Sequence, residues 1–164
     1  LLAQALGIAA PNVALLAAKG TVAPAFPSTS EAAALKSMAL QGAFPGAVVD
    51  GPMTPDVALT ADAARAHGYK SAVAGHADVL VAPSMEAATM VLRTLTGVTG
   101  GLAAGIVLGA RVPIVLPQPH DAMDARIASC VLARLVAIAS ANAPRAGTST
   151  PAPRAAESGT PVEA

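Results

Sequence analysis

The sequence predicts an α/β fold built on a mostly parallel sheet, and two observations lead to that prediction. Short apolar runs alternate with longer amphipathic stretches through the first 140 residues, which is the pattern of strands joined by covering helices. Glycine and proline follow several of the apolar runs, and these residues mark the points where an element ends. A chain of 164 residues is long enough for one domain with its own core.

Three apolar runs in the first half of the chain are predicted strands: Val13–Ala17, Ala47–Asp50 and Asp78–Ala82. Short apolar runs between turn residues are typical of buried strands. Gly105–Leu108 and Val112–Leu116 are two further apolar runs of the same kind. A parallel sheet with helices on both faces binds ligands at the carboxyl ends of its strands.

Helix signals stand between these strands. Ser28 and Glu31 have capping-box spacing, so we expect a helix from Ser28 to Gln41 that ends at Gly42. Thr54 precedes a proline suited to the first helical position, and this second helix should end at Gly68. A third should start at Pro83-Ser84 and continue to about Leu95.

The last predicted helix begins at Asp121. Apolar residues recur along it at spacings of four, four and three, which predicts one buried face: Ile127, Val131, Leu135 and Ile138. Arg126 and Arg134 fall off that stripe. Cys130, the one cysteine, lies in the apolar pattern and is predicted to be a small buried side chain.

Composition excludes several classes of partner. Ten basic and ten acidic residues cancel and only 2% of residues are aromatic, so nucleic acid has no electrostatic footprint. The three histidines, His67, His76 and His120, lack ligand spacing, so we expect no metal site. The apolar stretches Leu1–Ala18 and Thr94–Ala110 contain proline or several glycines, which argues against membrane spans. We therefore expect a cytoplasmic protein.

The ends of the sequence differ from its centre. The first residue is leucine rather than methionine, so we expect a fragment of a longer protein. Ala141–Ala164 carries four prolines and no periodicity, which predicts a disordered tail. A spacer to a downstream module is the alternative.

Four stretches together resemble a known family. They are Pro24–Leu35 (PAFPSTSEAAAL), Val49–Ala58 (VDGPMTPDVA), Val73–Ala87 (VAGHADVLVAPSMEA) and Ala103–Leu116 (AAGIVLGARVPIVL). In order and spacing they resemble the phosphate acetyl/butyryl transferase family, and we expect the butyryl branch to be the more similar one. They cover nearly all of the chain before the tail.

The resemblance implies a fold and a reaction. The fold would be a three-layer α/β/α, isocitrate dehydrogenase-like architecture of two lobes, of which this chain is the C-terminal part. Residues 1–102 would form most of the second lobe, and residues 103–140 would return to the first. The reaction would be reversible transfer of an acyl group, acetyl or butyryl, between acyl-CoA and inorganic phosphate. CoA would be a substrate, no other cofactor is implied, and the full-length protein would be a homo-oligomer.

The resemblance also implies site residues, with departures. Gln118 and Pro119 stand where the family carries a serine-arginine pair that binds phosphate. Gln118, His120 and Asp121 are the implied catalytic candidates, although His120 also suits a solvated loop and Asp121 a helix cap. Two other departures are Ala88-Thr89 in place of glycine-asparagine, and Ala18-Lys19-Gly20 in place of a glutamate.

The implied CoA and phosphate pocket includes Asp50, Gly51, Pro52, Gly105, Gly109 and Pro119. Asp50-Gly51-Pro52 suits a simple helix-leading loop equally well, because turns need glycine and proline for geometry alone. Gly75 and Asp78 are expected to serve a tight turn and the entry to a strand. The glycines at 105 and 109 would let backbone approach CoA closely.

Two functions remain open from the sequence. One is the phosphate acyltransferase, although these 164 residues alone are expected to be inactive. The other is a non-catalytic relative that binds acyl-CoA for regulation or mediates assembly, as in similar domains fused to some malic enzymes that also lack the serine-arginine pair. In either case, half of a domain should expose apolar surface.

Overall fold

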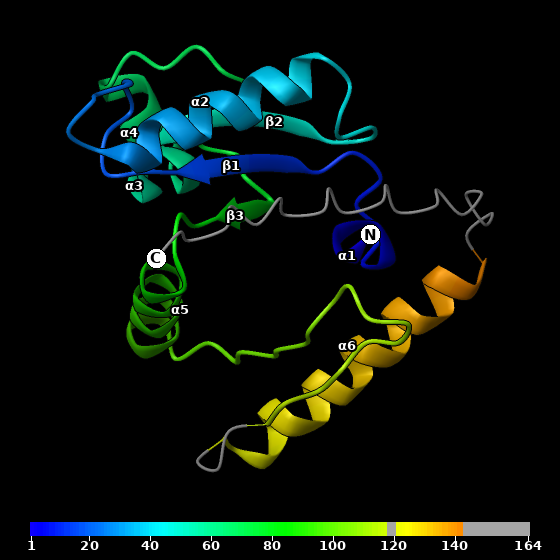
Figure 1. Ribbon diagram of the computed structural model, residues 1–164. Helices are drawn as coiled ribbons and strands as arrows, with labels where there is room; N and C mark the ends of the chain where they lie inside the picture. Colours follow the sequence, from blue (N-terminus) through cyan, green and yellow to red (C-terminus); the bar gives the residue numbers. More distant parts are fainter. Residues whose placement is uncertain (118–120, 143–164) are drawn as a thin grey trace, which may run out of the picture.

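The computed structural model describes residues 1–117 and 121–142. A sheet of three parallel strands lies at its centre, formed by β1 (Asn12–Leu16), β2 (Val48–Met53) and β3 (Val79–Val81) in the order β2-β1-β3 (Figure 1). Val13 of β1 stands opposite Val49 on one side and Val79 on the other. The three predicted strands and their parallel pairing are therefore confirmed.

Helices cover both faces of this sheet. Helix α2 (Pro27–Leu40) lies along one face, and α3 (Pro55–Leu59) with α4 (Ala61–Ala66) lies on the other (Figure 1). Successive side chains of a strand point to opposite faces, so Leu15 faces α2 while Ala14 and Leu16 face α3 and α4. The class is mixed α/β.

The core sits on the α3 and α4 face of the sheet. Its members are small or aliphatic, as the shortage of aromatic residues requires: Ala14, Leu16, Met53, Val57, Ala58, Ala64, Val73 and Ala74. Tyr69 and Leu80 pack against its edge. The side chain of Met53 is completely buried, and close packing of small residues replaces the large rings of other cores.

Helix α2 begins one residue before its predicted start. Phe26 is the N-cap residue, Pro27 occupies the first helical position, and no side chain caps the helix, so the capping box of Ser28 and Glu31 is absent. Proline is favoured there because its missing N–H would have no partner in the helix. The helix ends at Leu40, one residue before the predicted Gln41, and Gly42 follows it with a φ of 84°.

The predicted helix from Pro55 to Gly68 is broken in two. Thr60 separates α3 from α4 with an extended backbone (φ −124°, ψ 124°). Its hydroxyl donates to the Asp56 carbonyl at 2.6 Å, and such a local bond competes with helix continuation. The break lets both short helices turn alanine or valine side chains into the core.

The residues that lead into β3 have the predicted roles in a tight turn and at the strand entry. Gly75 has a φ of 79°, and a Cβ there would lie 2.6 Å from the Ala61 Cα, so the turn requires glycine. Asp78 accepts a hydrogen bond from the Asn12 N–H at 2.8 Å. This bond joins the entries of the two neighbouring strands.

Helix α5 (Met85–Thr99) continues beyond its predicted end at Leu95 and stops at Gly100, which is left-handed. The two apolar runs after it do not form strands in the described chain. They are joined by one antiparallel bridge between Val107 and Ile114. This bridge pairs only one residue of each run, whereas a strand in a sheet pairs residues along its length.

Helix α6 (Met123–Asn142) begins two residues after the predicted start at Asp121 and contacts α1 (Leu2–Ala5). The prediction that its apolar stripe is buried is wrong for this chain, because Ile127, Val131, Leu135 and Ile138 are 41% to 54% exposed. Ser129 and Val136 are buried instead, two turns apart on another line of the helix. Cys130 is exposed, which corrects its predicted burial. The stripe has no facing element in the described part of the chain.

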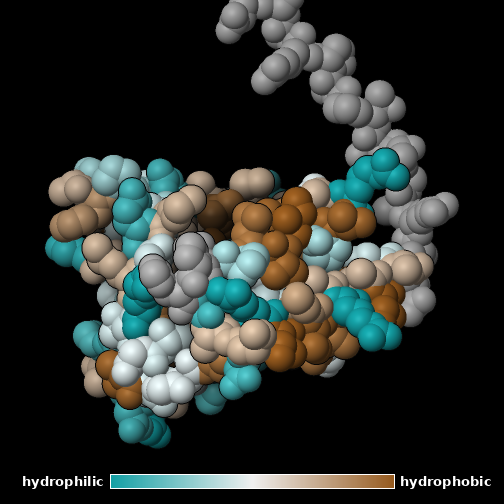
Figure 2. All heavy atoms as spheres, turned by 90° about the horizontal axis from the view of Figure 1, so that it is seen from below, coloured by the Kyte–Doolittle hydropathy of each residue, from teal (hydrophilic) through white to brown (hydrophobic). Residues whose placement is uncertain are grey.

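Figure 2 shows the resulting apolar surface, with hydrophobic side chains gathered on the α6 side of the molecule. None of the helices in the described ranges 1–117 and 121–142 is long and apolar enough to cross a membrane. The tail predicted for Ala141–Ala164 begins inside α6, and residues 143–164 lie outside the described residues.

Candidate functional site

The carboxyl edge of the sheet borders a cavity of about 300 Å³. Strands β1 and β3 both end there, and α2, α3 and α5 begin there (Figure 1). Parallel strands joined by helices place strand ends and helix starts at one edge. The walls come from all of these elements: Leu16, Ala17, Ala18, Ser28, Pro55, Ala82, Pro83, Ala87 and Val91. We name it the carboxyl-edge cavity.

The helix starts give this cavity its electrostatic character. The first turn of a helix presents N–H groups without helical partners and a partial positive charge. At α5, the Ser84 hydroxyl caps the helix by accepting from the Ala87 N–H at 3.2 Å. Hydrogen bonding by its own backbone N–H and then by Ser84 lowers the pKa of the exposed Glu86 carboxyl. Among the described residues, the cavity walls carry no charged side chain.

Asp50, a predicted pocket residue, takes part in a polar cluster instead of lining this cavity. The Lys36 ammonium lies 2.6 Å from its carboxylate, and the Gly51 N–H donates to it at 2.8 Å. Burial raises the pKa of Asp50, but hydrogen bonds from Lys36, Ser71 and Gly51 outweigh burial and hold it below its ordinary value. The Asp50 carboxylate therefore stays charged and fastens β2 to α2.

Gly51 and Pro52 are buried within β2. A Cβ at Gly51 would lie 2.6 Å from the Leu15 Cβ, so the strand pairing itself requires glycine there. The Pro52 carbonyl oxygen is 2.8 Å from the Tyr69 hydroxyl, whose pKa is raised by burial and then by the Asp50 charge. Asp50-Gly51-Pro52 therefore lies inside strand β2 and not in a loop.

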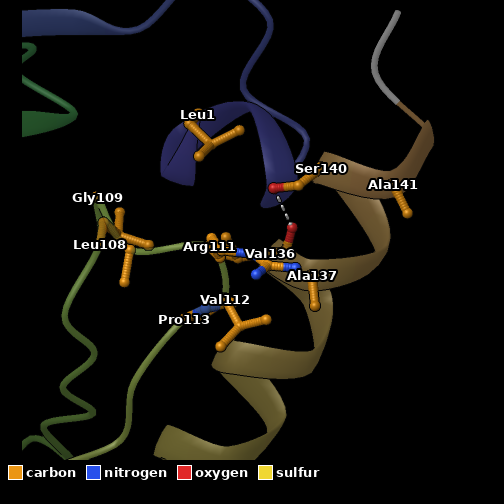
Figure 3. Close-up of a pocket in the computed structure, with 11 residues that line it drawn as sticks. Leu1, Leu108, Gly109, Arg111, Val112, Pro113, Val136, Ala137, Ser140 and Ala141 are labelled. Atoms are coloured by element: carbon orange, nitrogen blue, oxygen red, sulfur yellow. Dashed lines mark hydrogen bonds between the residues drawn. The ribbon is translucent and has the colours of Figure 1, made fainter. Parts of the chain in front are cut away.

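The other predicted glycines lie beside α6. The Gly105 N–H donates to the Ser129 hydroxyl at 3.0 Å, which donates in turn to the Ala125 carbonyl at 2.8 Å. Gly109, with a φ of 102°, lines a second cavity of about 270 Å³ between the 107–114 bridge, α1 and α6. Figure 3 shows Arg111 and Val136 facing this space. Its walls share no residue with the carboxyl-edge cavity.

The predicted catalytic positions are described only in part. Gln118, Pro119 and His120 lie outside the described residues. Asp121 is half-buried and stands two residues before α6. The structure thus separates Asp50-Gly51-Pro52 from Gly109 and groups neither with the carboxyl-edge cavity.

Several walls of the carboxyl-edge cavity were not predicted as site residues. Ser28, Pro55 and Pro83 were recognised only as helix starts. The signal that could have identified them is positional, because each follows a strand and opens a helix. In a parallel sheet, that position is where ligands bind.

An open parallel sheet, helices on both faces and a cavity at the carboxyl edge define the class of α/β domains that bind ligands at the carboxyl ends of their strands. A family model described as Phosphate acetyl/butaryl transferase matches residues 2–133. The chain belongs to the phosphate acetyl/butyryl transferase family.

Individual relatives agree with this membership. The chain is similar to the phosphate acetyltransferase of Rhizobium meliloti, with 50% identity over 133 residues, or 81% of this chain and 42% of the relative. It is 39% identical to the phosphate butyryltransferase of Clostridium acetobutylicum over 135 residues, or 82% of this chain and 45% of the relative. These identities contradict our expectation that the butyryl branch is the more similar one.

A solved structure shares the fold. The branched-chain phosphotransacylase from Enterococcus faecalis V583 superposes with a TM-score of 0.74 at 29% identity, covering 82% of this chain and 48% of that one. The chain therefore spans less than half the length of these relatives.

Proposed function

We propose that this chain forms part of an enzyme that transfers an acyl group between acyl-CoA and inorganic phosphate. The carrying observation is the family membership, which covers residues 2–133. The carboxyl-edge cavity supports it, because three helix starts meet at one opening and both substrates are phosphate-containing anions. Acetyl and butyryl groups are both compatible with the relatives.

The chemistry follows from the two substrates. A phosphate oxygen attacks the thioester carbonyl carbon, forming a C–O bond and a tetrahedral oxyanion. The carbonyl then re-forms, the C–S bond breaks, and CoA leaves as a thiolate. The proton that hydrogen phosphate carried is released to solvent, and the thiolate takes one from solvent, so the proton count balances. Catalysis of this step requires alignment of the reactants and stabilisation of negative charge.

We extend the proposal to architecture and residues on the strength of the family likeness. The complete domain would have the two-lobed, three-layer arrangement, with residues 1–102 in the second lobe and 103–140 in the first. Gln118, His120 and Asp121 would face the reacting groups. By the same likeness, the CoA and phosphate pocket would extend beyond the carboxyl-edge cavity and would include Asp50, Gly51, Pro52, Gly105, Gly109 and Pro119. The complete protein would be a cytoplasmic homo-oligomer.

A non-catalytic, CoA-binding relative is the second candidate, and one observation favours it. Gln118 and Pro119 occupy the positions of the family's serine-arginine pair. Neither side chain supplies the fixed, charged fork of donors that a guanidinium offers to phosphate.

One assay separates the two candidates. The natural polypeptide that contains these residues is incubated with acetyl-CoA or butyryl-CoA and phosphate, and acyl phosphate is trapped with hydroxylamine. The enzyme proposal predicts turnover, increased at least tenfold by Gln118→Ser combined with Pro119→Arg. CoA binding by calorimetry without turnover in either form would refute the enzyme and support the regulatory candidate.

A further inference from the structure

The loop from Ala17 to Phe26, which we name the β1–α2 loop, forms one rim of the carboxyl-edge cavity. Ala17 and Ala18 belong to the walls, and the loop ends where α2 begins. The Ala17 N–H donates to the Met53 carbonyl at 2.9 Å, which fixes the first residue of the loop to β2.

Tyr69 fixes the next part of this loop. Its hydroxyl lies 2.8 Å from the Gly20 carbonyl oxygen and 2.8 Å from that of Pro52. A Cβ at Gly20 would lie 1.8 Å from the same hydroxyl oxygen, so the close approach requires glycine. The residue before Gly20 is therefore held beside the end of β2.

Thr29 fixes the far end of the loop. It is completely buried, accepts a hydrogen bond from the Ala23 N–H at 3.0 Å and donates to the Phe26 carbonyl at 2.7 Å. The loop is thus tied at both ends by buried or half-buried hydroxyls. Such fixation pre-organises any side chain that the loop carries.

Lys19 is the only charged residue between Asn12 and Ser30. Its ammonium lies 5.2 Å from the centroid of the Phe26 ring, in cation–π contact with the N-cap residue of α2. The contact holds the ammonium beside the N-cap residue of α2, and Ser28 two residues later belongs to the cavity walls. Among the described residues, those walls contain no cation. We propose that Lys19 binds the phosphate group of a substrate at the carboxyl-edge cavity.

The sequence departures support this assignment, which rests on the proposed function. Lys19 stands in the stretch where the family carries a glutamate, and Pro119 stands where it carries the phosphate-binding arginine. This chain therefore carries a cation in the loop at the cavity rim and lacks the arginine of the family's serine-arginine pair. A lysine binds phosphate as a point charge where an arginine would bind it as a fork.

Carboxylates on the same helices offer Lys19 a competing role. Glu31 of α2, Asp56 of α3 and Glu86 of α5 follow the three helix starts. Lys19 forms no ion pair with another described residue. A lysine that serves only as their counter-charge would affect stability and leave phosphate binding unchanged.

The test measures binding by the natural polypeptide that contains these residues. Calorimetry gives dissociation constants for inorganic phosphate, CoA and pantetheine in wild type, Lys19→Gln, Lys19→Arg and the control Arg134→Gln on exposed α6. Comparing phosphate with CoA shows whether Lys19 binds inorganic phosphate or the phosphate groups of the coenzyme. Pantetheine, which has no phosphate group, is the control ligand.

Lys19→Gln is expected to raise the dissociation constant for inorganic phosphate, for CoA or for both roughly tenfold. The dissociation constants of Lys19→Arg should stay within about threefold of the wild-type values. Pantetheine binding and the control variant should not change. Equal affinities in wild type and Lys19→Gln, with or without a lower urea midpoint, would overturn the Lys19 assignment alone. A wild-type protein that binds neither phosphate nor CoA would overturn the proposed function and the assignment together.

Discussion

The sheet region, residues 12–82, and the α6 region, residues 103–117 with 121–142, use apolar residues in opposite ways. In the sheet region, side chains such as Met53 and Val57 are almost completely buried. In the α6 region, only Ser129 and Val136 are buried among the described residues, and the apolar stripe of α6 is exposed. Both regions are rich in alanine, valine and leucine.

The difference shows that an apolar pattern identifies a face that packs against another element, but does not show which element that is. Parallel pairing of three strands brings α2, α3 and α4 onto the sheet. The 107–114 bridge provides no comparable surface for α6. Since the chain spans less than half of its relatives, a family member of full length has more polypeptide with which to cover such a face.

The largest expected effect compares two methionines. Met53 is 0% exposed in β2, and Met123 is 68% exposed at the start of α6. Met53→Ala should lower the free energy of unfolding by about 2–5 kcal/mol through lost burial and a cavity. Met123→Ala should change it by less than about 0.5 kcal/mol. Urea denaturation checks both, and equal losses would break the comparison.

The next effect concerns buried hydroxyls. Thr29→Val keeps the shape of the side chain but removes its bonds to Ala23 and Phe26. Leaving these buried groups unpaired should cost about 1–3 kcal/mol. Thr96→Val in α5, where the hydroxyl donates to Leu92 near solvent, is the matched control and should cost less than about 0.5 kcal/mol. A cost at Thr96 as large as at Thr29 would contradict the role given to the loop.

Tyr69→Phe removes one half-buried hydroxyl and keeps the ring against the core. The expected cost is about 1 kcal/mol, the net value of one hydrogen bond. Hydrogen exchange should also show faster opening at Gly20 and its neighbours. Unchanged exchange there would show that Tyr69 does not fix the β1–α2 loop.

The smallest effect is the pH dependence from Asp50. Its pKa in the folded chain lies below the ordinary value of 3.8, so its stabilising contribution is present above that value and is lost as pH falls through the folded pKa. Asp50→Asn should cost about 0.5–1 kcal/mol near neutral pH, because Lys36 is partly exposed.

The difference between wild type and Asp50→Asn should therefore shrink as pH falls below about 4. Urea midpoints from pH 3 to pH 7 measure it. A difference that grows on acidification would contradict the sign. Asp124→Asn on exposed α6 is the control.

Local signals predicted much of the sheet region. The three strands and the end of α2 follow from apolar runs and from Gly42. The break at Thr60 could not be predicted, because a side-chain bond to Asp56 competes with the helix only in the folded geometry. The stripe of α6 was recognised, but its burial depends on a partner that periodicity does not reveal.

The candidate site was predicted less well. The sequence marks Ser28, Pro55 and Pro83 as helix starts, but only the strand order β2-β1-β3 brings them to one cavity. Asp50 was chosen for its place beside glycine and proline, and the structure pairs it with Lys36. Long-range packing decides both outcomes, and no local pattern encodes it.

Hydrogen exchange with and without CoA and phosphate tests the central claim most directly, namely that the substrate site lies at the carboxyl edge of the sheet. We predict that the ligands slow exchange at the amides of four residues that line the cavity, Ala17, Ala18, Ser28 and Ala87. Exchange at the amides of α6 should not change. Slowing confined to α6 and the 107–114 bridge, or no slowing anywhere, would contradict the account.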